Sequence, residues 1–157
     1  EVRAKLPTGL GTRPASWTLP THQAYGGWPH SDGGDIMEHV GNGPGVVHAS
    51  VHTGAYYLGI GTQKTATKQV QGGLKISTSI AWNLTPRGIR AFIGDEGILV
   101  FASEGRRPEA WPIDQRLHLL PNVAVGGDRG GQNGVDEAAF PASMVVDRVR
   151  VYALQNP

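Results

Sequence analysis

Glycine and proline recur along the whole chain, and no other feature restricts its fold as strongly. The sequence of 157 residues contains 23 glycines and 11 prolines, spread from one end to the other. Glycine weakens a helix and proline breaks one, whereas both are common in the turns between short strands. We therefore predict a single all-β domain over residues 1–157, a length that allows a hydrophobic core.

Alternating apolar and charged residues indicate strands, most clearly at the beginning of the chain. Over residues 1–7, Val2, Ala4 and Leu6 alternate with Arg3 and Lys5, as in a half-buried strand. Further strands are predicted within residues 15–20, 34–40, 46–53, 73–82, 116–127 and 143–154, with a hairpin over 87–105 that turns at 94–97. This pattern is typical of a β-sandwich or jelly roll.

Other parts of the sequence show no regular pattern. The polar, Thr-rich segment 61–73 is expected to be a mobile loop, and residues 8–14 are expected to form a loop as well. We predict no helix, no internal repeat and no linker between domains.

Composition excludes several classes of protein. The net charge is only +1 and charged residues make up 17% of the chain, which gives no indication of nucleic acid or another polyanion as a partner. The absence of cysteine excludes disulfides and thiolate metal sites. No run of apolar residues is long enough to cross a membrane, so we expect no membrane partner.

The segment SDGGDIMEH, residues 31–39, contains a carboxylate pair in an apolar surrounding. Residues three apart on a strand normally lie on opposite faces, so Asp35 and Glu38 can share a face only if Ile36-Met37 forms a β-bulge. Bulges are common beside active sites because they redirect a side chain. Alternatively, one carboxylate faces solvent and the other caps a turn.

A series of motifs in order along the chain then points to a family. They are RAKLP (3–7), WTLP (17–20), YGGWP (25–29), DIMEHVG (35–41), VVHASVHTG (46–54), EAWPIDQ (109–115), NVAVGG (122–127), GGQNGVD (130–136) and VDRVRVY (146–152). Together they resemble glycoside hydrolase family 16, in particular the bacterial endo-1,3-β-glucanases or laminarinases. The resemblance implies a β-jelly roll whose concave cleft holds β-glucan outside the cell, a retaining mechanism and no required cofactor.

The resemblance also implies roles for the carboxylates. Glu38 takes the position of the general acid/base and Asp35 that of its assisting carboxylate, while the position of the nucleophile falls on Gly33. A retaining glycosidase needs two carboxyl groups about 5–5.5 Å apart, one of which attacks the sugar. Asp32 is the nearest substitute but lies one residue out of register. Hydrolysis is therefore expected to be impaired or absent, and the alternative is a non-catalytic β-glucan-binding protein.

Several further residues match positions that line the cleft of the family. The expected substrate contacts are made by Trp17, Trp28, Trp111, His52 and Gln132. Aromatic faces stack on sugar rings, and a few polar groups fix the orientation of the ligand.

Two histidines and a fourth tryptophan are interpreted differently. His48 and His52 lie about 13 Å apart on one strand, too far to share a metal ion, and His48 is expected to be structural. Trp82 lies within a predicted strand and is expected in the core.

The chain departs from the family pattern near the expected cleft. Arg13 stands where laminarinases usually have Trp, Ser16 where they have Phe, and Asp128-Arg129 where they often have Asn-Trp. These changes predict altered sugar subsites. Asp147 matches a residue that binds structural calcium in many members, so the resemblance implies a calcium site there; alternatively, Asp147 faces a turn and binds no ion.

The family also has strands before the segment that matches residues 1–7. The resemblance therefore covers the C-terminal two thirds or so of the usual module. Unpaired sheet edges would otherwise be exposed, so we expect a second chain or self-association to complete the sandwich, unless the sequence is itself part of a longer chain.

Overall fold

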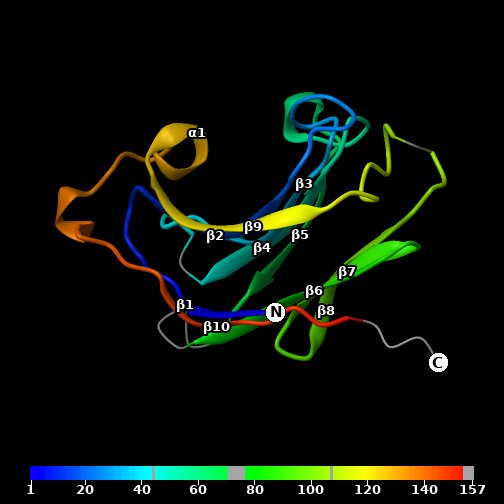
Figure 1. Cartoon of the computed structure of the whole chain (residues 1–157). Helices are drawn as coiled ribbons and strands as arrows, with labels where there is room; N and C mark the ends of the chain where they lie inside the picture. The colour runs from blue at the N-terminus through cyan, green and yellow to red at the C-terminus, as the bar shows by residue number, and fades with distance from the viewer. Residues whose placement is uncertain (44, 71–76, 107, 154–157) are drawn as a thin grey trace.

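The structure is a computed structural model that describes residues 1–43, 45–70, 77–106 and 108–153. Two five-stranded antiparallel sheets pack face to face (Figure 1). The first sheet has the order β10 (Val145–Val149), β1 (Val2–Lys5), β6 (Thr78–Thr85), β7 (Gly88–Ile93) and β8 (Glu96–Ala102). The second has the order β5 (Lys64–Gln69), β4 (Val46–His52), β3 (Gly33–His39), β2 (Thr12–Pro20) and β9 (Leu117–Val125). The predicted all-β sandwich is confirmed.

The core lies between the two sheets and follows from the alternation of side chains along each strand. On β4, Val47, Ala49 and Val51 are fully buried and face the first sheet, which leaves His48 and His52 on the outer face. Val47 belongs to a cluster with Val2, Ile80 and Met37 from the neighbouring strands. These contacts fix which side chains of the second sheet face away from the core.

The outer face of the second sheet is curved (Figure 1). The short helix α1 (Gly127–Gly130) lies over one end of this face, and the loops that follow β2 and β4 rise at the other end. Two 3₁₀ turns, Leu58–Ile60 and Glu137–Ala139, complete the elements. No helix in the described residues is long and apolar enough to span a membrane.

Three segments differ from the sequence expectation. The short helix α1 forms where no helix was predicted. Residues 64–69 of the Thr-rich segment form β5, an edge strand whose residues alternate between intermediate burial and exposure. Alternating Thr residues suit a strand, and lysines are common on sheet edges, where they prevent further pairing. Residues 12–14, expected in a loop, begin β2. The remainder of the predicted loop, residues 71–73, falls within the segment 71–76 that lies outside the described residues.

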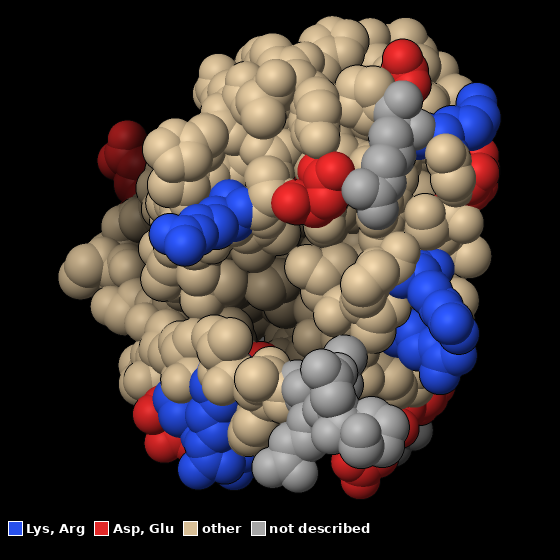
Figure 2. Space-filling model, turned by 45° about the vertical axis from the view of Figure 1, so that its right-hand side comes forward, with Lys and Arg blue, Asp and Glu red and all other residues tan. Residues whose placement is uncertain are grey.

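One side of the sandwich is open, between the edge strands β9 and β10. A cavity of about 850 Å³ extends between the sheets there and is lined by residues of both, among them Leu117, Leu119, Trp82 and Val149. Figure 2 shows that the molecule is deeply hollowed on one face. Val145, Val149 and Val151 are exposed along the same side. Apolar side chains at this opening are therefore only partly covered.

Candidate functional site

A bulge in β3 brings Asp35 and Glu38 to one face of the second sheet. Both neighbouring strands shift register between these residues: Asp35 lies opposite Trp17 and Ser50, whereas Glu38 lies opposite Ala15 and His48. Trp17 and Ala15 are two apart on β2, and their strand pairs with β9 without interruption. Directly opposed residues share a face. The predicted bulge is therefore present, and both carboxylates project from the outer, curved face.

His52 supports Asp35 from the adjacent strand. The His52 Nε2 atom lies 3.2 Å from Asp35 Oδ2, and both side chains are largely buried. The Trp28 ring packs on the His52 ring, with centroids 5.7 Å apart, and forms an edge contact with Tyr57. The expected position of His52 beside the carboxylates is thus what the structure shows.

Glu38 is buried and lies between two arginines. Arg129 of α1 donates to Glu38 Oε2, and Arg13 Nε of β2 lies 3.6 Å from Oε1. Burial raises the pKa of the Glu38 carboxyl, and the negative charge of Asp35 raises it further, while both arginines lower it. The net direction is upward, so the environment favours the protonated form of this carboxyl more than water does.

Gly33 lies on the same face as Asp35, two residues away and directly opposite His52. A Cβ atom at Gly33 would lie 2.6 Å from Trp28 Nε1, whereas one at Gly34 would enter the core beside Trp82. Position 33 is therefore the one that faces the site, and the Trp28 indole occupies the space beside it. The glycine at position 33 supplies no carboxylate.

Asp32, the carboxylate next to position 33, is enclosed in the protein. Its backbone adopts a left-handed conformation, with φ of 86°, and its side chain is 1% exposed. Neither carboxylate oxygen has a hydrogen-bond partner among the described residues. Burial raises the pKa of Asp32 to about 7. A carboxyl group that is enclosed in this way cannot reach a sugar on the outer face.

The four tryptophans have different environments. Trp17 lies on the outer face opposite Asp35, and its Nε1 donates to Asn122 at 3.0 Å. Trp28 is 52% exposed. Trp82 packs against the core, as predicted. The prediction that Trp111 contacts substrate is wrong: Trp111 is 1% exposed and packs on Phe101 in the core, because its loop folds back between the sheets.

His48 and Gln132 lie together at the end of the outer face, near Glu38. Both line a pocket of about 270 Å³ with Arg129 and Asn42. His48 also lies directly opposite Glu38, so it belongs to this face, although the sequence indicated a structural residue. Gln132 is exposed at the rim, where it was expected.

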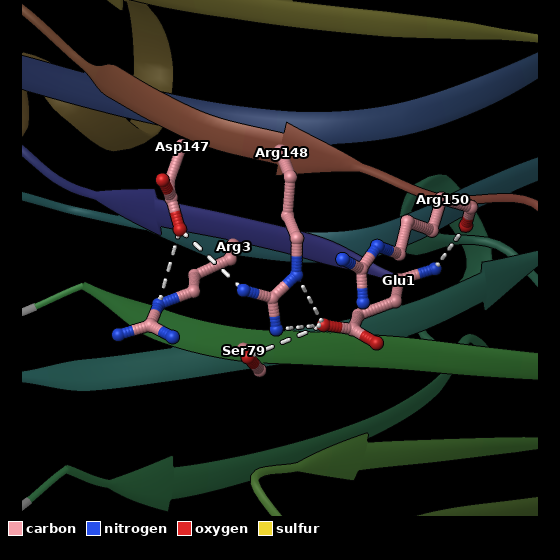
Figure 3. Close-up of polar contacts among 6 residues, drawn as sticks. All are labelled: Glu1, Arg3, Ser79, Asp147, Arg148 and Arg150. Carbon is pink, nitrogen blue, oxygen red and sulfur yellow. Dashed lines mark hydrogen bonds and ion pairs between the residues drawn. The ribbon is translucent and has the colours of Figure 1, made fainter.

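Asp147 lies on the far sheet, next to two arginines rather than other carboxylates (Figure 3). Its Oδ2 is 3.4 Å from Arg3 Nε and 3.5 Å from an Arg148 nitrogen. No group of three or more potential metal ligands occurs among residues 1–43, 45–70, 77–106 and 108–153. Calcium needs six to eight oxygen ligands, so these residues alone do not fit the ion. A calcium ion at Asp147 stays a prediction that requires further ligands.

Sequence reasoning missed the contacts of the two arginines. It identified Arg13 and Arg129 as unusual residues near the cleft, but not that both approach the same carboxylate. They are 116 positions apart in the sequence, and only the pairing of β2 with β9 brings them together. One signal in the sequence could have indicated that Arg13 and Arg129 lie together, because both stand where the family pattern has tryptophan.

The sequence was compared with family models and with known proteins. No family model matches the sequence. The chain is 49% identical over 159 residues to a β-glucanase of Rhodothermus marinus, an alignment that covers 97% of this chain and 56% of the relative. The chain therefore spans little more than half the length of that relative.

Solved structures agree with the sequence comparison. The laminarinase from Rhodothermus marinus superposes with a TM-score of 0.89 at 45% identity, covering 93% of this chain and 61% of that one. A mutant of SCLam, a non-specific endo-β-1,3(4)-glucanase from family GH16 with a 1,3-β-D-cellobiosyl-glucose at its active site, gives 0.88 at 35% identity, covering 93% and 56%. Over nearly its whole length, this chain is therefore similar in sequence and fold to a laminarinase and to an endo-β-1,3(4)-glucanase from family GH16, and it spans less than two thirds of each.

Proposed function

We propose that this chain is a domain of the endo-1,3-β-glucanase type that holds β-1,3-glucan on the outer face of its second sheet, and that its hydrolytic activity is impaired or absent. The observation that supports this most directly is the arrangement of three positions on one face. Asp35 and Glu38 project together from the bulged strand, and Gly33 beside them has no side chain.

Glu38 has the properties that a general acid needs. It is buried, its pKa is raised, and a like charge on Asp35 contributes to that rise. Carboxylic acids in glycosidases are tuned in the same way, so that they carry a proton to the leaving oxygen at neutral pH. Asp35, held by His52, is placed to orient charge around the reacting sugar.

The second carboxyl group of a retaining mechanism is the one that is lacking. Without a nucleophile no covalent glycosyl intermediate forms, and loss of such a group costs about 10⁴-fold or more in rate, roughly 5.5 kcal/mol in the barrier. Contacts that only bind the glycan, such as stacking on Trp17, do not depend on this group. The balance therefore favours binding over efficient hydrolysis.

The alternative is a protein that recognises β-glucan without any catalytic role. The position of Trp28 favours it, because the indole already fills the space beside Gly33 and adds an exposed aromatic surface to the site. Both versions place the sugar on the same face and differ only in whether the chain releases reducing ends.

Two assays on laminarin separate these versions. A reducing-sugar assay measures hydrolysis, and affinity electrophoresis in a laminarin gel measures binding. Slow sugar release that disappears in Glu38→Gln supports a residual enzyme, whereas retardation without release supports a binding protein. If the chain shows neither release nor retardation, the proposed function is wrong.

We also propose that the protein acts outside the cell and that further β-strands complete the open side of the sandwich, either from a second chain or by self-association. The open cavity between β9 and β10 and the exposed valines beside it support this partner. Light scattering coupled to size-exclusion chromatography tests self-association, since a strictly monomeric chain at micromolar concentration would contradict it.

A further inference from the structure

Two guanidinium groups approach a single carboxylate at one end of the candidate site. Arg129 donates to Glu38 Oε2, while Arg13 comes no closer than 3.6 Å to Oε1. The side chains of Arg13 and Arg129 are 37% and 36% exposed, whereas that of Glu38 is only 9% exposed. About one third of each arginine side chain is therefore open to solvent, whereas the Glu38 side chain is largely buried.

The charges at this end do not balance locally. Each guanidinium has five N–H donors, and Glu38 offers at most one negative charge to the two cations. The other carboxylate of the face, Asp35, is engaged by His52. In the described part of the chain, Glu38 is the sole carboxylate within 4 Å of either arginine. This leaves one positive charge and several donors available to a ligand.

A pocket adjoins Arg129 and is lined partly by hydrogen-bonding groups. Arg129, His48, Asn42 and Gln132 line its volume of about 270 Å³, together with apolar atoms of the turn between β3 and β4. No acidic residue occurs in this lining. His48 lies opposite Glu38 across the strand pair, so the pocket opens beside the candidate acid.

We propose that Arg13, Arg129 and the adjoining pocket form a subsite for an anionic substituent, a carboxylate or a sulfate ester, on the glycan that lies over Glu38. This inference rests on the proposed function, because it assumes that a β-linked glycan occupies the same face. Guanidinium groups bind carboxylate and sulfate oxygens through paired N–H donors, which gives both affinity and orientation. The two amides supply further hydrogen bonds for the sugar that carries the anion.

If the two arginines only neutralised Glu38, the position of the second arginine would have no explanation. A single arginine can pair with a carboxylate through two donors, and Arg129 is already in contact. The second arginine lies beyond hydrogen-bond distance and stays more than one third exposed. Two exposed cations beside an acid-free pocket are the arrangement that recognition of an anion requires.

The test compares three polysaccharides with the same backbone: laminarin, laminarin sulfate and laminarin oxidised to carry carboxylates. Isothermal titration at 20 and 300 mM NaCl measures the affinity of each. We expect at least one anionic form to bind about tenfold or more tightly than neutral laminarin at low salt, with the preference reduced at high salt. Preference for the sulfate or for the carboxylate form identifies the group.

Variants show whether the arginines are responsible. Arg13→Gln and Arg129→Gln should each remove most of the anionic preference, measured for each variant as the ratio of its affinities for anionic and neutral laminarin. Arg87→Gln removes the same charge from an exposed turn on the other sheet and should leave the preference intact. Arg129→Lys keeps the charge without the paired donors and should retain part of the preference, which also covers the case in which Arg129→Gln does not fold.

The outcomes distinguish this inference from the proposed function. Equal affinity for neutral and anionic laminarin would overturn the anionic subsite and leave β-glucan binding intact. The same conclusion would follow if Arg87→Gln reduced the anionic preference as much as Arg13→Gln and Arg129→Gln do. Failure of all three polysaccharides to bind would overturn the proposed function itself. Binding of the anionic forms alone, dependent on Arg13 and Arg129, would support the subsite and reject neutral glucan as the ligand.

Discussion

The Trp28 indole lies against Gly33 and takes up the space into which a side chain at position 33 would project. A Cβ atom at Gly33 would be 2.6 Å from Trp28 Nε1 and 3.9 Å from the Cβ atom of His52. Trp28 is half exposed, so its ring can move aside at modest cost. The space beside Asp35 and the aromatic surface of the site therefore both depend on this one pair of residues.

Gly33→Glu should restore hydrolysis, because it places a carboxylate beside Asp35 on the correct face. We expect the rate of reducing-sugar release from laminarin to rise by about 10³-fold or more, since a nucleophile is worth about 10⁴-fold. Trp28 must shift, so Gly33→Glu combined with Trp28→Ala should be at least as active as Gly33→Glu alone.

Gly33→Gln is the matched control for this gain. Glutamine has the same size and displaces Trp28 in the same way, but it cannot attack the sugar. Activity in Gly33→Gln equal to that in Gly33→Glu would mean that the carboxylate at position 33 is not the missing group.

Trp17→Ala should weaken binding of laminarin by about tenfold, the usual cost of removing a central aromatic contact. The ring lies opposite Asp35 on the outer face, where a sugar can stack on it. Trp17→Phe keeps an aromatic face and should lose much less, although it gives up the hydrogen bond to Asn122. Titration calorimetry with laminarin measures both, and unchanged affinity in Trp17→Ala would place the sugar elsewhere.

Trp111→Ala should behave as a core substitution. The side chain is 1% exposed and packs on Phe101, so its removal should lower the free energy of unfolding by about 3–5 kcal/mol. Urea unfolding followed by circular dichroism measures the loss. The fraction that remains folded should bind laminarin with unchanged affinity, and a specific loss of affinity in stable protein would show that Trp111 does contact the sugar.

Asp32 makes the stability depend on pH. Its carboxyl has an ordinary pKa of 3.8 in the unfolded chain and about 7 in the folded protein, because burial disfavours the charged form. Between these values the folded protein holds the extra proton, so the free energy of unfolding should fall as pH rises from about 4 to about 7 and level off above. Over this whole pH range, the titration of Asp32 should lower the free energy of unfolding by about 4 kcal/mol.

Asp32→Asn isolates this effect, because asparagine is neutral at every pH and tolerates the left-handed backbone. The difference in unfolding free energy between Asp32→Asn and the unsubstituted protein should grow from pH 5 to pH 8. Asp95→Asn, at an exposed carboxylate in the turn between β7 and β8, should show no such trend. Parallel pH profiles for Asp32→Asn and the unsubstituted protein would contradict the burial of a protonated Asp32.

Sequence reasoning predicted the fold and the central bulge because both depend on local rules. Alternation and frequent turns required strands, and the three-residue spacing of Asp35 and Glu38 required an extra residue in β3. The position of His52 followed from its match to the family and is what the pairing of β3 with β4 shows. These features are set by residues close together in sequence.

The misses depend on contacts between distant segments. Trp111 lies in a segment that matches a cleft-forming part of the family, but its side chain packs in the core. β5 is polar because it is an edge strand, and polarity alone does not separate such a strand from a loop. The approach of Arg13 and Arg129 to Glu38 requires the register of β2 and β9, which no local pattern reveals.

A crystal structure of the protein soaked with laminarihexaose tests the central claim most directly. We predict continuous density for the oligosaccharide over the outer face of the second sheet, against Trp17 and within reach of Asp35 and Glu38, with its glycosidic bonds unbroken. Oligosaccharide bound away from these residues, or cleaved at Glu38 in the unsubstituted protein, would contradict it.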